Sequence, residues 1–288
     1  MGPSGGRENG EHPWALHSLE PIRSAALLLA LLPRRPREFG DRVAGYADLG
    51  LERLFGKPPS YETVGWDEAL RVVEVQPGLG RSILGESALA EIEESTRRLL
   101  EGIRREDTFS QRWAADSLFA RCCYLSCRLI QPSVVMETGV AYGVSSAFIL
   151  KALEANGRGT LHSVDLPPLR MKAERFWGIA VPDELRGRWC LHRGSSTPVL
   201  PRLLRQMGSV DLFVHDSLHT YRNMRREFET VWPYLRTGGL LLADDVERNR
   251  AFGEVRLRYP ALWRVVEDRE RHPLHGRAAP VVFGIAVK

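Results

Sequence analysis

Two short segments, an aspartate followed by a histidine and a pair of adjacent aspartates, carry side chains suited to catalysis. Asp216 is followed three residues later by His219, and Asp244 and Asp245 are adjacent further along the chain. A histidine can take the proton of a hydroxyl, and carboxylate oxygens can hold a hard cation that lowers the hydroxyl's pKa. Three crowded carboxylates without a cation would repel one another. The set predicts proton transfer assisted by Mg²⁺ or a similar ion, although helix capping or a structural Asp216–His219 pair would also use these residues.

A glycine-containing turn is the second chemical signal. Residues 137–146 read Glu-Thr-Gly-Val-Ala-Tyr-Gly-Val-Ser-Ser. Glycines let the backbone approach a ligand closely, and the start of the following helix favours negative charge. The spacing is not G-x-G-x-x-G, because Ala141 stands at the second glycine position and Gly143 is one position early for the third. Asp165 follows Gly143 by 22 residues, where an acid can accept both ribose hydroxyls. The turn and the acid together predict a nucleoside-containing cofactor. The turn by itself could also be a structural turn that binds no ligand.

Short apolar strands alternating with helices must position these side chains. The expected strands are 133–137, 160–164, 189–192, 210–215, 240–243 and 280–287, and the expected helices are 111–130, 145–155, 201–207 and 221–235. This alternation predicts an α/β fold: a Rossmann-like, doubly wound, mostly parallel sheet with helices on both faces. Such sheets bind ligands at the carboxyl ends of their strands. Because the polar residues follow the strands, we expect them to share one crevice.

The first hundred residues have a different pattern. Residues 1–14 are rich in glycine and polar residues and are expected to be a disordered terminus. Residues 15–108 predict an α-helical N-terminal appendage, with helices over 21–32, 66–73 and 86–105, that serves as a lid or an oligomer contact. Residues 109–288 are expected to form the cofactor-binding domain. No motif in the N-terminal region indicates what it binds.

Composition excludes several classes of protein. Of 40 basic residues, 36 are arginine and only four are lysine, and the net charge of +4 is too small and dispersed to predict nucleic-acid binding. No lysine lies in a phosphate-binding G-x-x-x-x-G-K-[ST] loop. The apolar run 25–32 is far shorter than the ~20 residues of a membrane span. The four cysteines (122, 123, 127 and 190) have no zinc-ligand spacing and are interpreted as buried thiols of a cytoplasmic protein.

The order of these motifs resembles the class I S-adenosylmethionine-dependent methyltransferases. Within them it is similar to the bacterial small-molecule O-methyltransferase branch, which includes macrolide-sugar and cephalosporin-hydroxylase-like proteins. The resemblance runs from about residue 134 to 252 and includes the last strand. Its most specific pieces are ETGVAYGVSS, HSVDLP, VDLFVHDSLHTYRNM and LRTGGLLLADDV.

The resemblance implies roles for individual residues. In such a methyltransferase Glu137, Gly139 and Gly143 would hold the methionine part of the cofactor, with Tyr142 and Ser145 in the same turn. Asp165 would bind the ribose. Further cofactor contacts would come from Gly194, Ser195 and Asp216, although many relatives have an acid where Ser195 stands. The implied metal ligands are Asp216, Asp244 and Asp245, and the implied catalytic residues are His219, as the base, and Asp216.

The leading hypothesis is therefore an S-adenosylmethionine-dependent O-methyltransferase with a divalent cation such as Mg²⁺. Its acceptor would be a hydroxyl of a small molecule, such as a sugar or another secondary metabolite, and its partners would be neither nucleic acid nor membrane. A homo-oligomer would be formed through the helical region. A nicotinamide-dependent oxidoreductase is disfavoured, because the glycine spacing differs and no catalytic Tyr-x-x-x-Lys pair exists. A non-catalytic, cofactor-binding regulatory or assembly protein would not need the acidic cluster.

Overall fold

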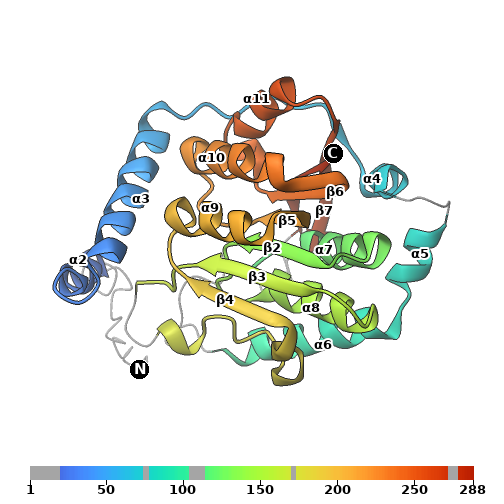
Figure 1. The fold of residues 1–288 in the computed structure, drawn as a ribbon, viewed down its shortest axis with the longest axis horizontal. Helices are drawn as coiled ribbons and strands as arrows, with labels where there is room; N and C mark the ends of the chain where they lie inside the picture. The colour runs from blue at the N-terminus through green and yellow to red at the C-terminus, as the bar shows by residue number, and fades with distance from the viewer. Residues whose placement is uncertain (1–19, 74–77, 104–113, 170–172, 272–277) are drawn as a thin grey trace, which may run out of the picture.

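A mixed eight-stranded sheet forms the centre of the molecule. The computed structural model describes residues 20–73, 78–103, 114–169, 173–271 and 278–288 (Figure 1). The strands lie in the order β1-β7-β8-β6-β5-β2-β3-β4. Their bounds are β1 Thr63–Val64, β2 Val134–Thr138, β3 Thr160–Asp165, β4 Trp189–Arg193, β5 Val210–His215, β6 Leu235–Asp244, β7 Leu262–Arg271 and β8 Ala278–Val287.

The pairing confirms the predicted Rossmann-like, mostly parallel sheet. The five strands β6, β5, β2, β3 and β4 run parallel to one another, and β1 is parallel to β7. In the described part of the chain, β8 alone runs antiparallel, against both β6 and β7. From β2 the chain moves outward to β3 and β4 and then returns to β5 on the other side. The carboxyl ends of β2 and β5 therefore form the topological switch point, where such sheets bind ligands.

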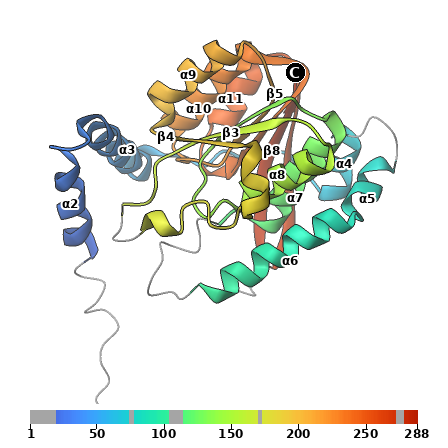
Figure 2. The ribbon, with the colours of Figure 1, turned by 60° about the horizontal axis from the view of Figure 1, so that its bottom comes forward.

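Helices cover both faces of the sheet (Figure 2). One face packs against α7 (Ser117–Ile130) and α8 (Val144–Ala155), with α6 (Ser87–Gly102) outside them. The other face carries α9 (Ser196–Met207), α10 (Tyr221–Val231) and α11 (Ala251–Arg258). Two apolar clusters fill these layers, and successive strand residues such as Val135 and Met136 enter opposite clusters. This burial on both faces explains the continuous apolar strands of the sequence.

The N-terminal region is helical but contributes to the same core. It contains α2 (Glu20–Leu31), α3 (Pro36–Phe55), α4 (Trp66–Val73) and α5 (Leu79–Leu84), followed by α6. Buried side chains of α4 to α6, including Leu70 and Leu89, belong to the cluster that contains α7 and α8. The two-residue strand β1 extends the sheet beyond β7. The expected disordered terminus, 1–14, lies outside the described residues.

Some boundaries differ from those expected. The strand β6 begins at Leu235 rather than Leu240, with an irregular register to β5. The helix α9 begins at Ser196 rather than Pro201, because the Ser195 hydroxyl caps it by accepting from the Thr197 amide. The helix expected over 221–235 ends at Val231 and continues as the short 3₁₀ helix η4 (Trp232–Tyr234). The other 3₁₀ helices are η2 Ala173–Arg175, η3 Asp183–Arg188 and η5 Val246–Arg248.

The cysteines occupy two different environments. Cys122, Cys123 and Cys127 are buried on α7, and burial raises the pKa of each thiol. Cys190 on β4 is exposed, so the interpretation of all four as buried thiols is wrong for this residue. The reason is its place on the edge strand of the sheet, which has a neighbour on one side only. Among the described residues, no helix has the length and apolarity that crossing a membrane requires.

Candidate active site

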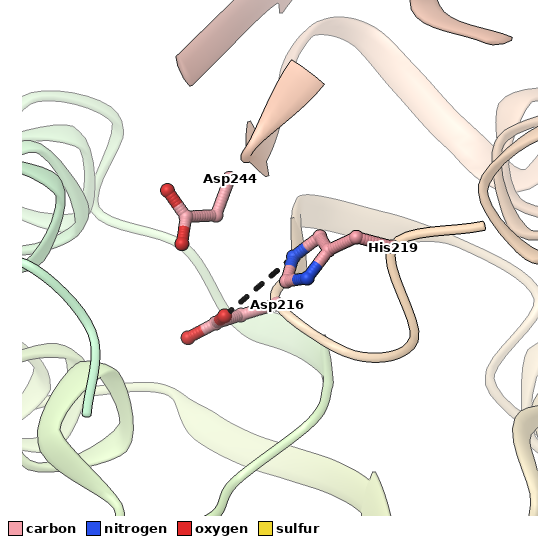
Figure 3. Close-up of side chains that lie close together, drawn as sticks. All are labelled: Asp216, His219 and Asp244. Carbon is pink, nitrogen blue, oxygen red and sulfur yellow. Dashed lines mark ion pairs between the residues drawn. The ribbon is translucent and has the colours of Figure 1, made fainter. Parts of the chain in front are cut away.

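Asp216, His219 and Asp244 come together at the carboxyl ends of β5 and β6 (Figure 3). Each offers a ligand atom that lies within 4.8 Å of the other two. The two strands are parallel neighbours, which brings the residue after β5 beside the last residue of β6. A hydrogen bond of 2.8 Å from the Asp216 amide to the Thr138 carbonyl joins the end of β5 to that of β2. The sequence therefore predicted correctly that these residues share one edge.

The cluster carries little compensating positive charge. Burial, followed by repulsion from Asp245, raises the pKa of Asp216 and of Asp244 well above the usual range. Burial, together with the nearby His215 and Arg248, lowers the pKa of His219 well below its usual value. A buried carboxylate, a partly buried carboxylate and an imidazole nitrogen are a donor set that divalent cations accept. The residues present therefore fit a bound cation.

Asp245 lies on the other side of the histidine ring. Its Oδ2 is 2.7 Å from Nη2 of Arg248 and 3.5 Å from Nδ1 of His219. The Nε2 atom of His219 lies 3.9 Å from Oδ1 of Asp216 and is buried without a hydrogen-bond partner. Of the three expected metal ligands, the structure groups Asp216 and Asp244 with His219. It places Asp245 where it can orient the ring.

The glycine turn packs tightly against the strand ends. Gly139 has a φ of +86°, and a Cβ added there would lie 1.9 Å from the Asp216 carbonyl oxygen. Gly143 has a φ of +83° and precedes α8, and its added Cβ would lie 2.9 Å from the Cα of Gly178. Only glycine satisfies both the backbone angle and the close approach. The Tyr142 side chain is fully buried in the core under the turn.

Glu137 is buried beneath this turn. It accepts hydrogen bonds from the hydroxyls of Ser145 at 2.7 Å and of Ser146 and Ser163 at 2.6 Å each. Burial raises its pKa from 4.5 to about 7, against the opposing effect of the three serines. Both carboxylate oxygens, and the expected site residue Ser145, are thus engaged in supporting the turn from within.

Asp165 lies beside the same turn, as the spacing predicts. Its Oδ2 accepts from the amides of Val140 at 3.1 Å and Ala141 at 3.2 Å, and from Nε1 of Trp177 at 2.9 Å. The spacing of the acid and the turn gives no sign of this contact with Trp177. Gly194 and Ser195 follow β4, and the Gly194 amide donates to the Asp165 carbonyl at 2.9 Å. The expected cofactor residues therefore follow one edge from β5 to β4.

The helix α3 lies along this edge, a placement that the sequence did not predict (Figure 1). Glu38 accepts from Arg193 at the end of β4, and Arg42 donates to the Pro167 carbonyl after β3 at 2.7 Å. At the other end of the helix, Glu52 accepts from the Tyr221 amide at 3.0 Å. The contacting residues recur every three or four positions and are mostly charged. The spacing of these charged residues was the signal in the sequence that could have indicated this contact.

Apolar side chains of α3 point outward. Leu54 and Phe55 are 75% and 74% exposed, whereas Glu38 is the helix's buried residue. A helix that packs on an apolar core has the opposite arrangement. The charged face of α3 therefore borders a polar site. A cavity of about 160 Å³ lies between the C-terminal half of α3 and the first turn of α10, and Glu52, Tyr221 and Asn249 contribute to its lining.

Comparison with known proteins agrees with this site. Residues 136–246 match the family model described as a methyltransferase domain, and this range contains the glycine turn, Asp165 and the Asp216–Asp244 cluster. The protein therefore contains a methyltransferase domain, as the motifs predict. No curated protein matches the sequence.

Several solved structures are similar at low sequence identity. The O-methyltransferase TomG from Streptomyces achromogenes, involved in tomaymycin synthesis and solved with S-adenosylmethionine, is 16% identical. Its match has a TM-score of 0.49 and covers 84% of this chain and 95% of TomG. The O-methyltransferase from Bacillus cereus, in complex with S-adenosylhomocysteine, is 14% identical. Its match has a TM-score of 0.46 and covers 77% of this chain and 96% of that one.

Proposed function

We propose that this methyltransferase transfers the methyl group of S-adenosylmethionine to a hydroxyl of a small polar molecule, such as a sugar or another secondary metabolite. The observation that supports this most strongly is the cluster of Asp216, His219 and Asp244 beside the glycine turn. Transfer to oxygen requires removal of a proton, and the cluster combines a candidate base with candidate metal ligands. A pure cofactor-binding protein has no need for such a set.

His219 is the proposed proton acceptor. Its Nδ1 faces Asp245, and its Nε2 has no hydrogen-bond partner and lies on the side of Asp216. The lowered pKa keeps the imidazole neutral, so Nε2 has a free lone pair for the hydroxyl proton. Asp245 then stabilises the imidazolium that results. The ring's fixed orientation limits which oxygen of an acceptor it reaches.

Asp216 and Asp244 are the proposed ligands of a divalent cation such as Mg²⁺. Such an ion, when bound, lowers the pKa of an acceptor hydroxyl and balances the negative charge of the cluster. On the cofactor side, Asp165 would bind the ribose hydroxyls. Gly139 and Gly143 would let the backbone approach the methionine part, and Gly194 with Ser195 would border the adenine.

The acceptor is proposed to bind between the strand ends and α3. Support comes from the charged inner face of this helix and from the cavity beside the turn that carries His219. The Oε1 atom of Glu52 is buried without a hydrogen-bond partner and can accept from a hydroxyl. A lining of this kind favours a molecule with several hydroxyl groups over an apolar one.

The test combines binding and turnover. S-adenosylhomocysteine should raise the melting temperature, and the NADH control should not. Tritiated S-adenosylmethionine is then incubated with methyl glucoside, methyl rhamnoside and catechol, with Mg²⁺ or with EDTA. We expect product from at least one hydroxyl compound, at least 10-fold less with EDTA, and none with His219→Ala, which still binds S-adenosylhomocysteine. If the protein binds S-adenosylhomocysteine but forms no methylated product, either from these compounds or from an extract of the source organism, the non-catalytic alternative is favoured.

A further inference from the structure

Glu227 forms a second polar network on the opposite face of the sheet from Glu137. It lies on α10, is 1% exposed, and accepts hydrogen bonds from four side chains. Thr138 and His215 donate to Oε2 at 2.6 and 2.7 Å, and Ser217 and Asn223 contact Oε1 at 3.0 and 3.1 Å. Nothing in the sequence distinguishes this glutamate from its charged neighbours on the helix.

These donors come from the elements that form the site. Thr138 ends β2, His215 ends β5, and Ser217 lies in the turn between Asp216 and His219. Asn223 strengthens the same link, because its Nδ2 also donates to the Ser217 hydroxyl and to the Leu218 carbonyl, each at 3.0 Å. One buried side chain thus ties together both strands of the switch point and the turn of the proposed base.

The charge on Glu227 is stabilised. The contact with His215 and the hydroxyl donors outweigh burial and lower its pKa from 4.5 to about 2. A buried carboxylate is costly unless donors surround it, and here they do. An anion attracts all four donors at once, so it restricts the turn more strongly than a neutral acceptor would.

Glu227 also orients the histidine behind His219. Because the carboxylate can only accept, Nδ1 of His215 carries a proton. The His215 ring then packs edge-on against the His219 ring, with centroids 5.4 Å apart and planes at 90°. His215 is fully buried, and its ring supports one side of His219. A change at Glu227 therefore reaches His219 through the turn and through this ring contact.

We infer that Glu227 is a positioning residue for methyl transfer, holding Asp216 and His219 in place through Ser217, Asn223 and His215. The inference rests on the proposed function of His219 and Asp216. It goes beyond that proposal by assigning a role to a helix residue that lies outside the metal and cofactor ligands. A residue that only supports the fold would affect stability and leave turnover per folded molecule unchanged.

Glu227→Gln is the informative variant. Its amide has one accepting oxygen, so its NH₂ group must face one pair of donors. Asn223 Nδ2 cannot accept, and its orientation is fixed because its Oδ1 accepts from Ser196 and Arg226. The NH₂ group should therefore face Thr138, whose hydroxyl can rotate, and His215, which can move its proton to Nε2. The matched control is Glu229→Gln on the same helix, where Glu229 pairs with Arg225 and Arg258 at the surface.

Two measurements test the inference. In the first, kcat and KM are determined with the hydroxyl compound that the wild type methylates. The kcat value is calculated per site that binds S-adenosylhomocysteine. We expect Glu227→Gln to lower kcat at least 10-fold, with KM for S-adenosylmethionine within 2-fold. Glu229→Gln should match the wild type. A lower melting temperature with unchanged kcat per site would overturn the inference.

The second measurement needs no turnover. Nitrogen-15 spectra of histidine-labelled protein identify the His219 ring through its absence in His219→Gln. The His219 and His215 ring signals should both shift in Glu227→Gln and stay in place in Glu229→Gln. If the wild type methylates no compound and the two histidine signals still shift in Glu227→Gln, only the proposed function has failed. If the His219 signals do not move, the positioning role is wrong whatever the enzyme does.

Discussion

The buried Glu137 should make the protein less stable as the pH rises from 4.5 to about 7. Its pKa is about 7 in the folded protein and about 4.5 when exposed, so the folded state holds its proton more tightly. Between these two values the unfolded chain has already released the proton that the folded chain retains, and the free energy of unfolding falls. Glu137→Gln removes this titration. The free energy of unfolding of the variant should therefore increase relative to that of the wild type as the pH increases.

The magnitude follows from the interval between 4.5 and about 7. At ~1.4 kcal/mol for each pH unit, the wild type loses about 3 kcal/mol between pH 4.5 and 8 relative to the variant. Any constant packing cost of the amide beside Ser145, Ser146 and Ser163 cancels, because only the change with pH is compared. The assay is urea unfolding followed by circular dichroism at pH 5, 6.5 and 8, with the exposed Glu62→Gln as control. A stability difference that stays within ~0.5 kcal/mol from pH 5 to 8 would refute the reasoning.

Three further substitutions test other parts of the site. Gly139→Ala should lower stability by ~3 kcal/mol or more in urea unfolding, because its Cβ would meet the Asp216 carbonyl at a φ of +86°; a loss below ~1 kcal/mol would contradict the observed approach. Trp177→Phe should abolish most of the tryptophan emission change on titration with S-adenosylhomocysteine, since the indole donates to Asp165; an unchanged signal would place the cofactor elsewhere. Glu38→Gln should speed tryptic cleavage within α3 several-fold, and 0.5 M NaCl should do the same to the wild type if ion pairs with Arg42 and Arg193 hold the helix.

The strand ends were the most predictable part of the molecule. The aspartates at positions 165, 216 and 244 mark the carboxyl ends of their apolar strands. A parallel sheet then brings these ends to one edge. The strand β7 was missed because its charged residues break the apolar pattern, although Trp263 and Val265 are buried. Its place near the sheet edge depends on pairing with β8, a long-range contact that local sequence does not encode.

The supporting residues were harder to predict than the site itself. Glu227 looks like one more charge on a helix rich in arginine, and only its packing against β2 and β5 shows that it is buried. Similarly, the charged spacing on α3 is ordinary for an exposed helix face. Its role at the strand ends depends on partners more than 100 residues away, such as Pro167 and Arg193. In both cases tertiary contacts, not local pattern, determine what the residue does.

Because the cysteines differ in exposure, one thiol of the protein can be labelled selectively. Three thiols are buried on α7 with raised pKa values, so a maleimide reagent at neutral pH should find Cys190 as the accessible one in the folded chain. Cys190 lies on β4, three residues before the Arg193 that binds Glu38 of α3. A fluorophore there would report on the attachment of α3 during turnover, without any engineered cysteine and without touching the residues proposed to bind cofactor or metal.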